Sequence, residues 1–187
     1  MKKSYAQKEE TKQWIFEAFI SLINTMPYHK ITITSISKKA GVPRSTFYRY
    51  YDTKEDVLKD YIQYFFEVFS YKLKQYHHIT IKNYIQFHFL FFKENEIYFQ
   101  TLKKLHYEYI FFDYISNPQL YSHYQGDDKN YVIYQTISLL SIIFNWVTSQ
   151  NQLSISYMSE MVMSLLSEDL MKKILPIFLT VHTKLSQ

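Results

Sequence analysis

The sequence lacks cysteine and has only two glycines and four prolines in 187 residues. The absence of cysteine excludes a disulfide scaffold and zinc sites built on thiolates, and it is typical of a protein of the reducing cytoplasm. Residues that break regular structure are rare, whereas Ile, Leu, Tyr, Phe and Lys are abundant, so the composition predicts an all-α fold. The length allows one or two domains with a proper hydrophobic core.

Long hydrophobic runs are also lacking. Met1-Lys2-Lys3 is basic, but the polar stretch from Ser4 to Gln13 follows where a signal peptide would have its apolar segment. Residues 130–159 carry no charge, yet eight polar side chains interrupt the first twenty of them. This stretch is therefore too polar for a membrane-spanning helix, and we expect no signal peptide and no membrane segment.

The motifs of common enzymes and cofactor sites are missing as well. The sequence has no glycine-rich phosphate loop, no His-Glu-x-x-His and no nucleophile in a recognisable turn. His77-His78 has no nearby carboxylate that would complete a metal site. We therefore expect a protein that is not an enzyme and that needs no metal or cofactor.

The positive charge of the chain lies in its first third. Residues 1–60 contain 11 Lys and Arg against 7 Asp and Glu, whereas residues 61–187 contain 10 of each. Both arginines, Arg44 and Arg49, also lie in the first part. A basic module joined to a neutral one is the charge pattern of a nucleic-acid-binding protein with a second domain. We therefore expect a DNA-binding domain in residues 1–60 and a second domain in residues 61–187.

Apolar periodicity and favourable end residues predict helices in the first domain. The first helix covers residues 13–26, and its apolar face is made of Trp14, Ile15, Ala18, Phe19, Leu22 and Ile23. The second is short and buries Ile33, Ile36 and Ala40. Thr32 is a suitable N-cap for this second helix, and Gly41 would end it in a conformation with positive φ.

The third helix is expected over about residues 43–51. Pro43 suits its first turn because the φ of proline is already fixed and its missing N–H would be unpaired there. Phe47 and Tyr51 are expected to turn inward. Two short helices joined by a tight turn, with another helix packed beneath them, form a helix-turn-helix.

Further helices are predicted along the rest of the chain. Thr53 caps a long helix that runs to about residue 76, with acidic residues in its first turn. The later helices are expected near residues 80–94, 96–104, 105–115, 130–149 and 156–171. Asn117-Pro118 interrupts the pattern, and residues 125–128 are expected to form a loop. The predicted fold is an all-α protein with an N-terminal helix-turn-helix and a helical C-terminal domain.

The exposed face of the second helix of such a motif must reach base edges in the major groove. Side chains that meet this requirement are Arg44, Ser45, Thr46 and Tyr48. Residues that flank the helix must contact phosphates, and the candidates are Lys38, Lys39, Arg49, Tyr50 and Lys54. The alternatives are a solvated role for Lys38 and Lys39 and a core role for Tyr48.

Three short motifs in this region match the spacing of a known family. They are Ile36-Ser37-Lys38-Lys39-Ala40-Gly41-Val42, Thr46-Phe47-Tyr48-Arg49-Tyr50-Tyr51 and Thr53-Lys54-Glu55-Asp56-Val57-Leu58. Residues 31–58 thus resemble the DNA-binding signature of the TetR family of bacterial regulators. Two positions depart from it, because Pro43 stands where the family usually has Ser and Ser37 where it usually has Ala.

The resemblance implies an all-helical homodimer that binds a pseudo-palindromic operator in double-stranded DNA. It implies that the helix starting near residue 43 reads bases through Arg44, Ser45 and Thr46, with Thr34 also able to reach a base. It further implies contacts with the DNA backbone, made by Thr32, Tyr48, Tyr50 and Lys54.

The C-terminal two thirds resemble the family only in outline. The resemblance implies that residues 130–171 build the dimer, through two helices with apolar faces. The residues of these faces are Ile133, Ile137, Leu140, Phe144 and Val147, and Met158, Met161, Val162, Leu165 and Leu166. The alternative is that these side chains form only the core of one chain.

Aromatic residues are concentrated in the second domain, since 26 of the 34 Phe and Tyr residues lie beyond residue 60. Such residues can line a pocket for an apolar, aromatic or cationic effector. The candidates are Tyr84, His88, Phe92, Tyr107 and Phe111; the alternative for each is a place in the core. We therefore expect a ligand-responsive repressor. The alternative is a regulator or activator of the same fold that is controlled by a protein partner.

Overall fold

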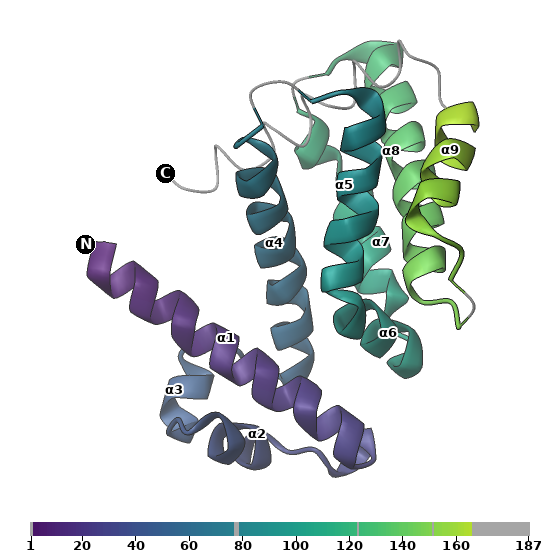
Figure 1. Cartoon of the computed structure of the whole chain (residues 1–187). Coiled ribbons are helices and arrows are strands. Elements are labelled where there is room, and N and C mark those ends of the chain that lie inside the picture. The colour runs from purple at the N-terminus through teal and green to yellow at the C-terminus, as the bar shows by residue number, and fades with distance from the viewer. Residues whose placement is uncertain (1, 77–78, 123, 151, 166–187) are drawn as a thin grey trace. The chain divides into compact units, whose positions relative to one another are not determined.

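The computed structural model describes residues 2–76, 79–122, 124–150 and 152–165, which form nine α-helices, two short 3-10 helices and no strand (Figure 1). The all-α prediction is confirmed. His77-His78, residues 166–171 of the predicted last helix and the predicted dimer contact Leu166 lie outside the described residues. No helix within these ranges is long and apolar enough to cross a membrane.

The chain divides into two compact units, residues 1–63 and residues 64–187. The N-terminal unit contains α1 (Lys2–Thr25), η1 (Tyr28–Lys30), α2 (Ile33–Ala40), α3 (Arg44–Tyr48) and the first half of α4 (Lys54–Leu73). The C-terminal unit contains the rest of α4, then α5 (Ile81–Glu94), α6 (Glu96–Leu105), α7 (Glu108–Ser116), η2 (Pro118–Tyr121), α8 (Gly126–Val147) and α9 (Ile155–Leu165).

Helix α1 begins well before the predicted residue 13, because the preceding stretch is rich in Lys, Gln and Glu, which favour a helix. Its buried face contains Ile15, Phe19 and Ile23, as predicted. Trp14 was expected on that face, but 46% of its surface is exposed. Phe16 is buried in its place, and its ring stacks on Tyr61 of α4 at 3.6 Å between centroids.

The turn between α2 and α3 has the expected chemistry. The Thr32 hydroxyl accepts a hydrogen bond from the Ser35 backbone N–H at 3.1 Å and so caps α2. Gly41 ends the helix with φ 69°, a conformation that glycine adopts without strain. Pro43 is the N-cap of α3, one position before the predicted first turn.

Helix α3 is shorter than predicted and ends at Tyr48, although Phe47 and Tyr51 are buried as expected. The burial prediction for α2 is right only for Ile36, because Ile33 and Ala40 are half-buried. In a helix of eight residues, only one narrow face can point fully into the core.

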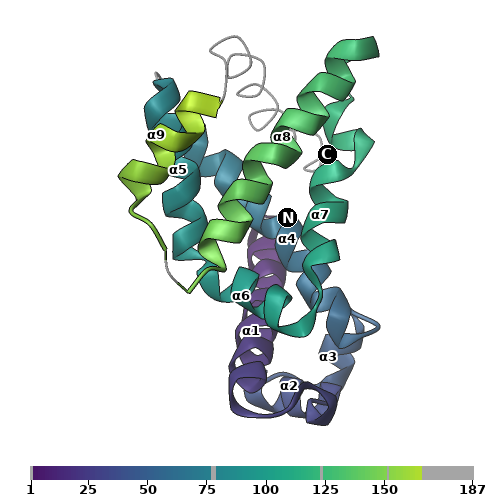
Figure 2. The ribbon, with the colours of Figure 1, turned by 90° about the vertical axis from the view of Figure 1, so that its right-hand side faces the viewer.

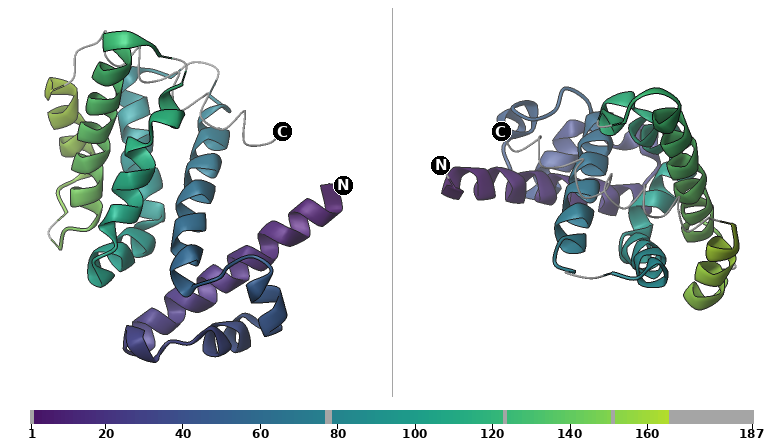
Figure 3. Two further views of the ribbon diagram at one scale, coloured as in Figure 1. Left: turned by 180° about the vertical axis from the view of Figure 1, so that it is seen from behind. Right: turned by 90° about the horizontal axis from the view of Figure 1, so that it is seen from above.

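In the C-terminal unit α5 is central, since it packs against both α8 and α9 (Figures 1 and 3). Helix α8 also packs against α6 and α7 (Figure 2). The predicted loop at residues 125–128 is wrong, because α8 already begins at Gly126. Asp127 and Asp128 fill the first turn of α8, where carboxylates interact favourably with the helix dipole.

The core of this unit is a cluster of phenylalanine rings. Phe99 of α6 lies 5.1 Å from Phe65 of α4 and 4.7 Å from Phe92 of α5, measured between ring centroids. Phe111 of α7 and Phe144 of α8 are also in contact, at 5.1 Å. The Phe65–Phe99 pair is edge-to-face, a favourable geometry for aromatic rings in a packed core, and the other two pairs are stacked.

Candidate nucleic-acid interface

Helix α3 presents Arg44 and Tyr48 side by side on the surface. The Arg44 guanidinium donates a hydrogen bond to the Tyr48 hydroxyl at 3.3 Å and lies 5.7 Å from the centre of its ring. Tyr48 is 48% exposed and Ser45 is exposed, while Thr46 is half-buried. Phe47, between Arg44 and Tyr48 in sequence, is buried and anchors the helix in the core. The residues expected to read bases therefore lie on or next to the exposed face of α3.

The residues expected to contact the DNA backbone are in different surroundings. Arg49, Lys38 and Lys39 are exposed, and Tyr50 is half-buried with its ring 6.3 Å from Tyr51. Thr34 is exposed on the first turn of α2, and so is Thr32, its N-cap. The hydroxyl of Thr32 is engaged in capping α2, so it has a structural role whether or not it contacts DNA.

Lys54 is the exception among the expected phosphate ligands. Its ammonium group donates hydrogen bonds to the backbone carbonyls of Tyr28, at 2.9 Å, and Ile31, at 3.0 Å. It also lies 3.8 Å from the centre of the Tyr28 ring. The positive charge of Lys54 is thus directed into the protein in this structure.

Asp60 of α4 joins two other parts of the unit, and the sequence analysis did not predict this role. One carboxylate oxygen accepts a hydrogen bond from Lys12 of α1 at 2.7 Å, and the other accepts from the hydroxyl of buried Tyr51 at 2.8 Å. Burial and the nearby negative charge of Asp60 raise the pKa of Tyr51, so its hydroxyl stays protonated and donates. Residues this far apart in sequence carry no pairing signal in a single chain.

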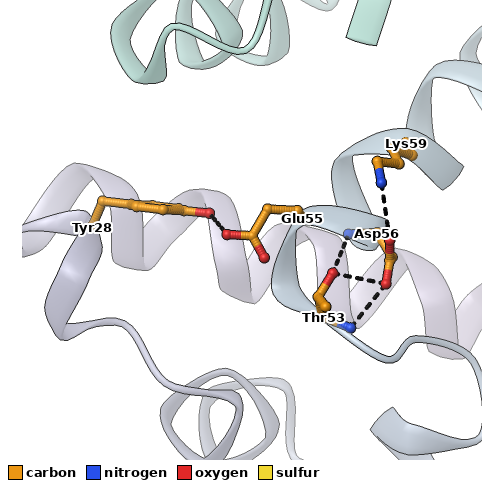
Figure 4. Close-up of polar contacts among 5 residues, drawn as sticks. All are labelled: Tyr28, Thr53, Glu55, Asp56 and Lys59. Atoms are coloured by element: carbon orange, nitrogen blue, oxygen red, sulfur yellow. Dashed lines mark hydrogen bonds and ion pairs between the residues drawn. The ribbon is translucent and has the colours of Figure 1, made fainter.

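The start of α4 is fixed by reciprocal capping between Thr53 and Asp56 (Figure 4). The Asp56 carboxylate accepts from the Thr53 backbone N–H at 2.9 Å and from its hydroxyl at 2.7 Å. Burial alone would raise the pKa of Asp56, but these bonds and the charge of Lys59 together hold it below its ordinary value. The predicted N-cap at Thr53 is confirmed.

Ser37 is buried in α2, and its hydroxyl has no hydrogen-bond partner among the described residues. The TetR-like signature usually has Ala at this position, which would avoid the cost of about 1–3 kcal/mol for a buried unpaired hydroxyl. Nothing in the structure explains why serine stands here.

Comparison with known proteins identifies this module. Residues 15–61 match the family described as bacterial regulatory proteins, tetR family. Residues 15–61 are therefore a DNA-binding domain of the TetR type. A TetR-family protein is a DNA-binding regulator, which agrees with the exposed Arg44 and Tyr48 on α3. No match was found among curated proteins.

Solved structures of regulatory proteins are similar over most of the chain. The dihydroxyacetone kinase operon activator DhaS is 20% identical, with a TM-score of 0.54 over 88% of this chain and 96% of that chain. The fatty acid degradation regulator FadR from Bacillus halodurans is 16% identical, with a TM-score of 0.52 over 87% and 97%. A TetR regulator from Streptococcus agalactiae 2603V is 25% identical, with a TM-score of 0.48 over 94% and 97%. The first two likenesses show a shared fold.

The residues expected to bind an effector lie in different surroundings. Tyr84 and His88 are buried neighbours with ring centres 4.4 Å apart, whereas Phe92 and Phe111 belong to the phenylalanine core. Tyr107 is only half-buried. The surface hollows of about 410 and 600 Å³ in this unit are lined by other side chains.

His88 has the surroundings of a core histidine. Its Nδ1 atom lies 2.9 Å from the Tyr84 backbone carbonyl, and no part of the side chain is exposed. Burial lowers the pKa of His88 to about 4, although the backbone hydrogen bond opposes this shift. The imidazole is therefore neutral at physiological pH.

The faces expected to form the dimer are only partly available on a single chain. Leu140, Phe144 and Val147 of α8 are already buried within the unit, so for them the alternative of an intramolecular core role holds. Met158 and Val162 of α9 are buried too. The other expected residues on described parts of the chain are half-buried or exposed, namely Ile133, Ile137, Met161 and Leu165.

Proposed function

We propose that this chain is a homodimeric transcriptional regulator that binds a pseudo-palindromic operator through α3 and responds to a small effector bound by the C-terminal unit. The observation that carries the proposal is the exposed pair of Arg44 and Tyr48 on a short helix that buried Phe47 anchors in the core. A helix of this kind fits the major groove with its first turn toward the bases. A two-fold dimer presents two such helices to two half-sites.

The side chains of α3 have separate roles in this proposal. Arg44 reads guanine, because a guanidinium can donate two hydrogen bonds to its O6 and N7 atoms. Ser45 and Thr46 contact neighbouring base edges, with Thr34 of α2 at the margin. Phosphates are contacted by residues around the helix, namely Thr32, Tyr48, Arg49 and Tyr50. Tyr48 also orients Arg44 through their mutual hydrogen bond.

Arg44→Ala and Arg49→Ala are expected to have different effects on DNA binding. Loss of Arg44 should relax the base preference at one position and cost about 1–3 kcal/mol of specific binding. Loss of Arg49 should weaken binding to all duplexes alike and reduce the slope of log K against log salt by about one. Binding of both variants to a duplex selected from a random pool, and to an unrelated duplex, is measured across salt concentrations. Parent-like behaviour of both variants would refute the assignment of α3.

Self-association is supported by exposed apolar and aromatic side chains on α8 and α9. Tyr134 is 68% exposed on α8, and Tyr157 and Leu165 are 58% and 64% exposed on α9. Large exposed side chains on consecutive helices mark a contact surface. We propose that these residues, with the half-buried Ile133 and Ile137, form the homodimer interface within residues 130–171.

Effector binding is supported by buried polar groups in the C-terminal unit. The hydroxyls of Tyr84 and Tyr114 are buried and have no hydrogen-bond partner within the described ranges. Buried hydroxyls are almost always paired, so each is a place where a ligand or a water can bind. The preferred effector is therefore an apolar or aromatic molecule with one or two polar groups.

Control by a protein partner is the second candidate, and a different observation favours it. The surface hollow of about 410 Å³ lies between the end of α4 and α5, where Tyr76 is 52% and Leu90 51% exposed. One protein of similar fold is named as an operon activator, so the fold alone does not fix the sign of regulation.

An effector should stabilise the protein and weaken operator binding at once. A ligand that distinguishes the DNA-bound from the free state changes DNA affinity typically by about 5–150-fold. Apolar and aromatic compounds are screened by thermal shift, and each hit is tested for its effect on the selected duplex. Tyr84→Phe is the matched variant, since it removes one unpaired hydroxyl and keeps the ring, and it should weaken ligands that bind this group.

Hits that stabilise without changing DNA affinity would disprove the coupling. If every compound fails and a protein is recovered that changes operator binding, the second candidate function replaces the first.

A further inference from the structure

The Lys54 ammonium group is held by three partners from one short segment. Its two hydrogen bonds go to the carbonyls of Tyr28 and Ile31, and the third contact is the face of the Tyr28 ring at 3.8 Å. An ammonium group has three donors, so two of them are already used inside the protein. A cation in the first turn of a helix is otherwise unfavourable, and these partners offset that cost.

Glu55, the next residue of α4, holds the same segment from its other side. Its carboxylate accepts a hydrogen bond from the Tyr28 hydroxyl (Figure 4). The ring of Tyr28 is therefore fixed at its face by Lys54 and at its tip by Glu55. We call Lys54, Glu55 and Tyr28 the entry clasp, because residues 28–31 lead directly into α2.

The exit of the helix-turn-helix is tied to the same helix. Tyr51 follows α3, and its hydroxyl donates to Asp60, which lies further along α4. Asp60 also binds Lys12 of α1. The first two turns of α4 thus hold both the segment before α2 and the segment after α3.

We infer that Lys54 is a positioning residue, which sets the placement of α2 and α3 through the entry clasp, and that it is not a phosphate ligand. This inference rests on the proposed DNA-binding function. A phosphate ligand contributes equally to all DNA sequences, because phosphates carry no sequence information. A positioning residue acts instead on the contacts that need a defined helix orientation, which are those to base edges.

The test compares Lys54→Ala with Arg49→Ala in the full chain. The probes are a duplex selected from a random pool by the parent protein and an unrelated duplex of equal length. Lys54→Ala should bind the selected duplex about tenfold more weakly and the unrelated duplex almost as tightly as the parent does. Its slope of log K against log salt should not change. Arg49→Ala should lower the slope by about one on both duplexes. Lys54→Arg should recover most of the loss, since a guanidinium can also bind carbonyls and lie over a ring.

Tyr28→Leu separates the clasp from charge effects. Tyr28 is neutral, yet its replacement should weaken binding to the selected duplex as much as Lys54→Ala does. The slope of log K against log salt should again stay unchanged. The double variant with Lys54→Ala and Tyr28→Leu should bind the selected duplex about as tightly as the weaker-binding of the two single variants. The reason is that both changes break the same contact. A fall in slope of about one for Lys54→Ala, together with parent-like binding by Tyr28→Leu, would overturn the inference.

Unfolding measurements test the clasp without DNA. The effects of Lys54→Ala and Tyr28→Leu on the free energy of unfolding should be strongly non-additive. Additive effects would contradict the clasp even if the protein binds its operator as proposed. Absence of any DNA binding by the parent, with this non-additivity present, would refute the proposed function and leave the clasp standing.

Discussion

Replacing Leu140 by glutamate is expected to unfold the C-terminal unit and not to release folded monomers. Leu140 has no exposed surface, and its helix packs against α5, α6 and α7. Removing a buried leucine side chain costs about 2–5 kcal/mol, and placing an unpaired carboxylate there costs more. The total is at least about 4 kcal/mol, which is comparable to the whole stability of a domain. Chemical denaturation, monitored by circular dichroism, measures this loss in the free energy of unfolding.

Tyr134→Glu is the matched control on the same helix. Its side chain is 68% exposed, so the change should alter the free energy of unfolding by no more than about 0.5 kcal/mol. If α8 forms the proposed dimer interface, this variant should sediment as a folded monomer at concentrations where the parent is a dimer. A folded, monomeric Leu140→Glu protein would show that its side chain faces a partner and not the core.

The free energy of unfolding should fall by about 2 kcal/mol between pH 7.5 and pH 5 through His88 alone. Burial lowers the pKa of His88 to about 4, whereas an unfolded histidine titrates near 6.5. Between these values the unfolded chain binds a proton that the folded chain does not. Stability from this group is therefore complete above about pH 6.5 and is lost as the pH falls toward 4.

His88→Leu removes this titration and should flatten the dependence of stability on pH over the same range. The variant also loses the contact between Nδ1 and the Tyr84 carbonyl, so its stability at pH 7.5 can be lower. The informative quantity is the difference between the parent and variant curves. If the curves of stability against pH ran parallel for parent and variant from pH 7.5 to pH 5, a neutral, buried His88 would be contradicted.

Local signals predicted the N-terminal unit well because its geometry depends on neighbouring residues. Thr32 and Gly41 fix the two ends of α2, and Thr53 with Asp56 fixes the start of α4. Each of these interactions spans at most a few positions. The exposed placement of Arg44 was expected because an arginine is rarely buried unless it is paired.

Interactions between distant residues were not predictable from one sequence. Asp60 binds Lys12 and Tyr51, and Lys54 binds two carbonyls more than twenty positions away. A lysine at a helix start looks like a phosphate ligand when only its own segment is considered. The carbonyls that bind it become visible only in three dimensions.

Periodicity alone also failed to distinguish a self-association surface from a core. Leu140 and Phe144 lie at helical spacing, but apolar residues of a dimer interface and of a core both have this spacing. The structure shows that α8 is covered by three helices, so most of its apolar face is used within one chain. Gly126 misled the prediction in another way, because a glycine beside two aspartates suits a loop and a helix start equally well.

Helix α4 runs without a break from Lys54 to Leu73, and the boundary between the two units falls inside it, after Gln63. The units are therefore joined by hydrogen-bonded helical turns and not by a linker. Helix formation is cooperative, so melting α4 in one unit removes support from its continuation in the other. The folding of the two units is consequently linked, and a protease that needs an extended chain finds no open loop at their junction.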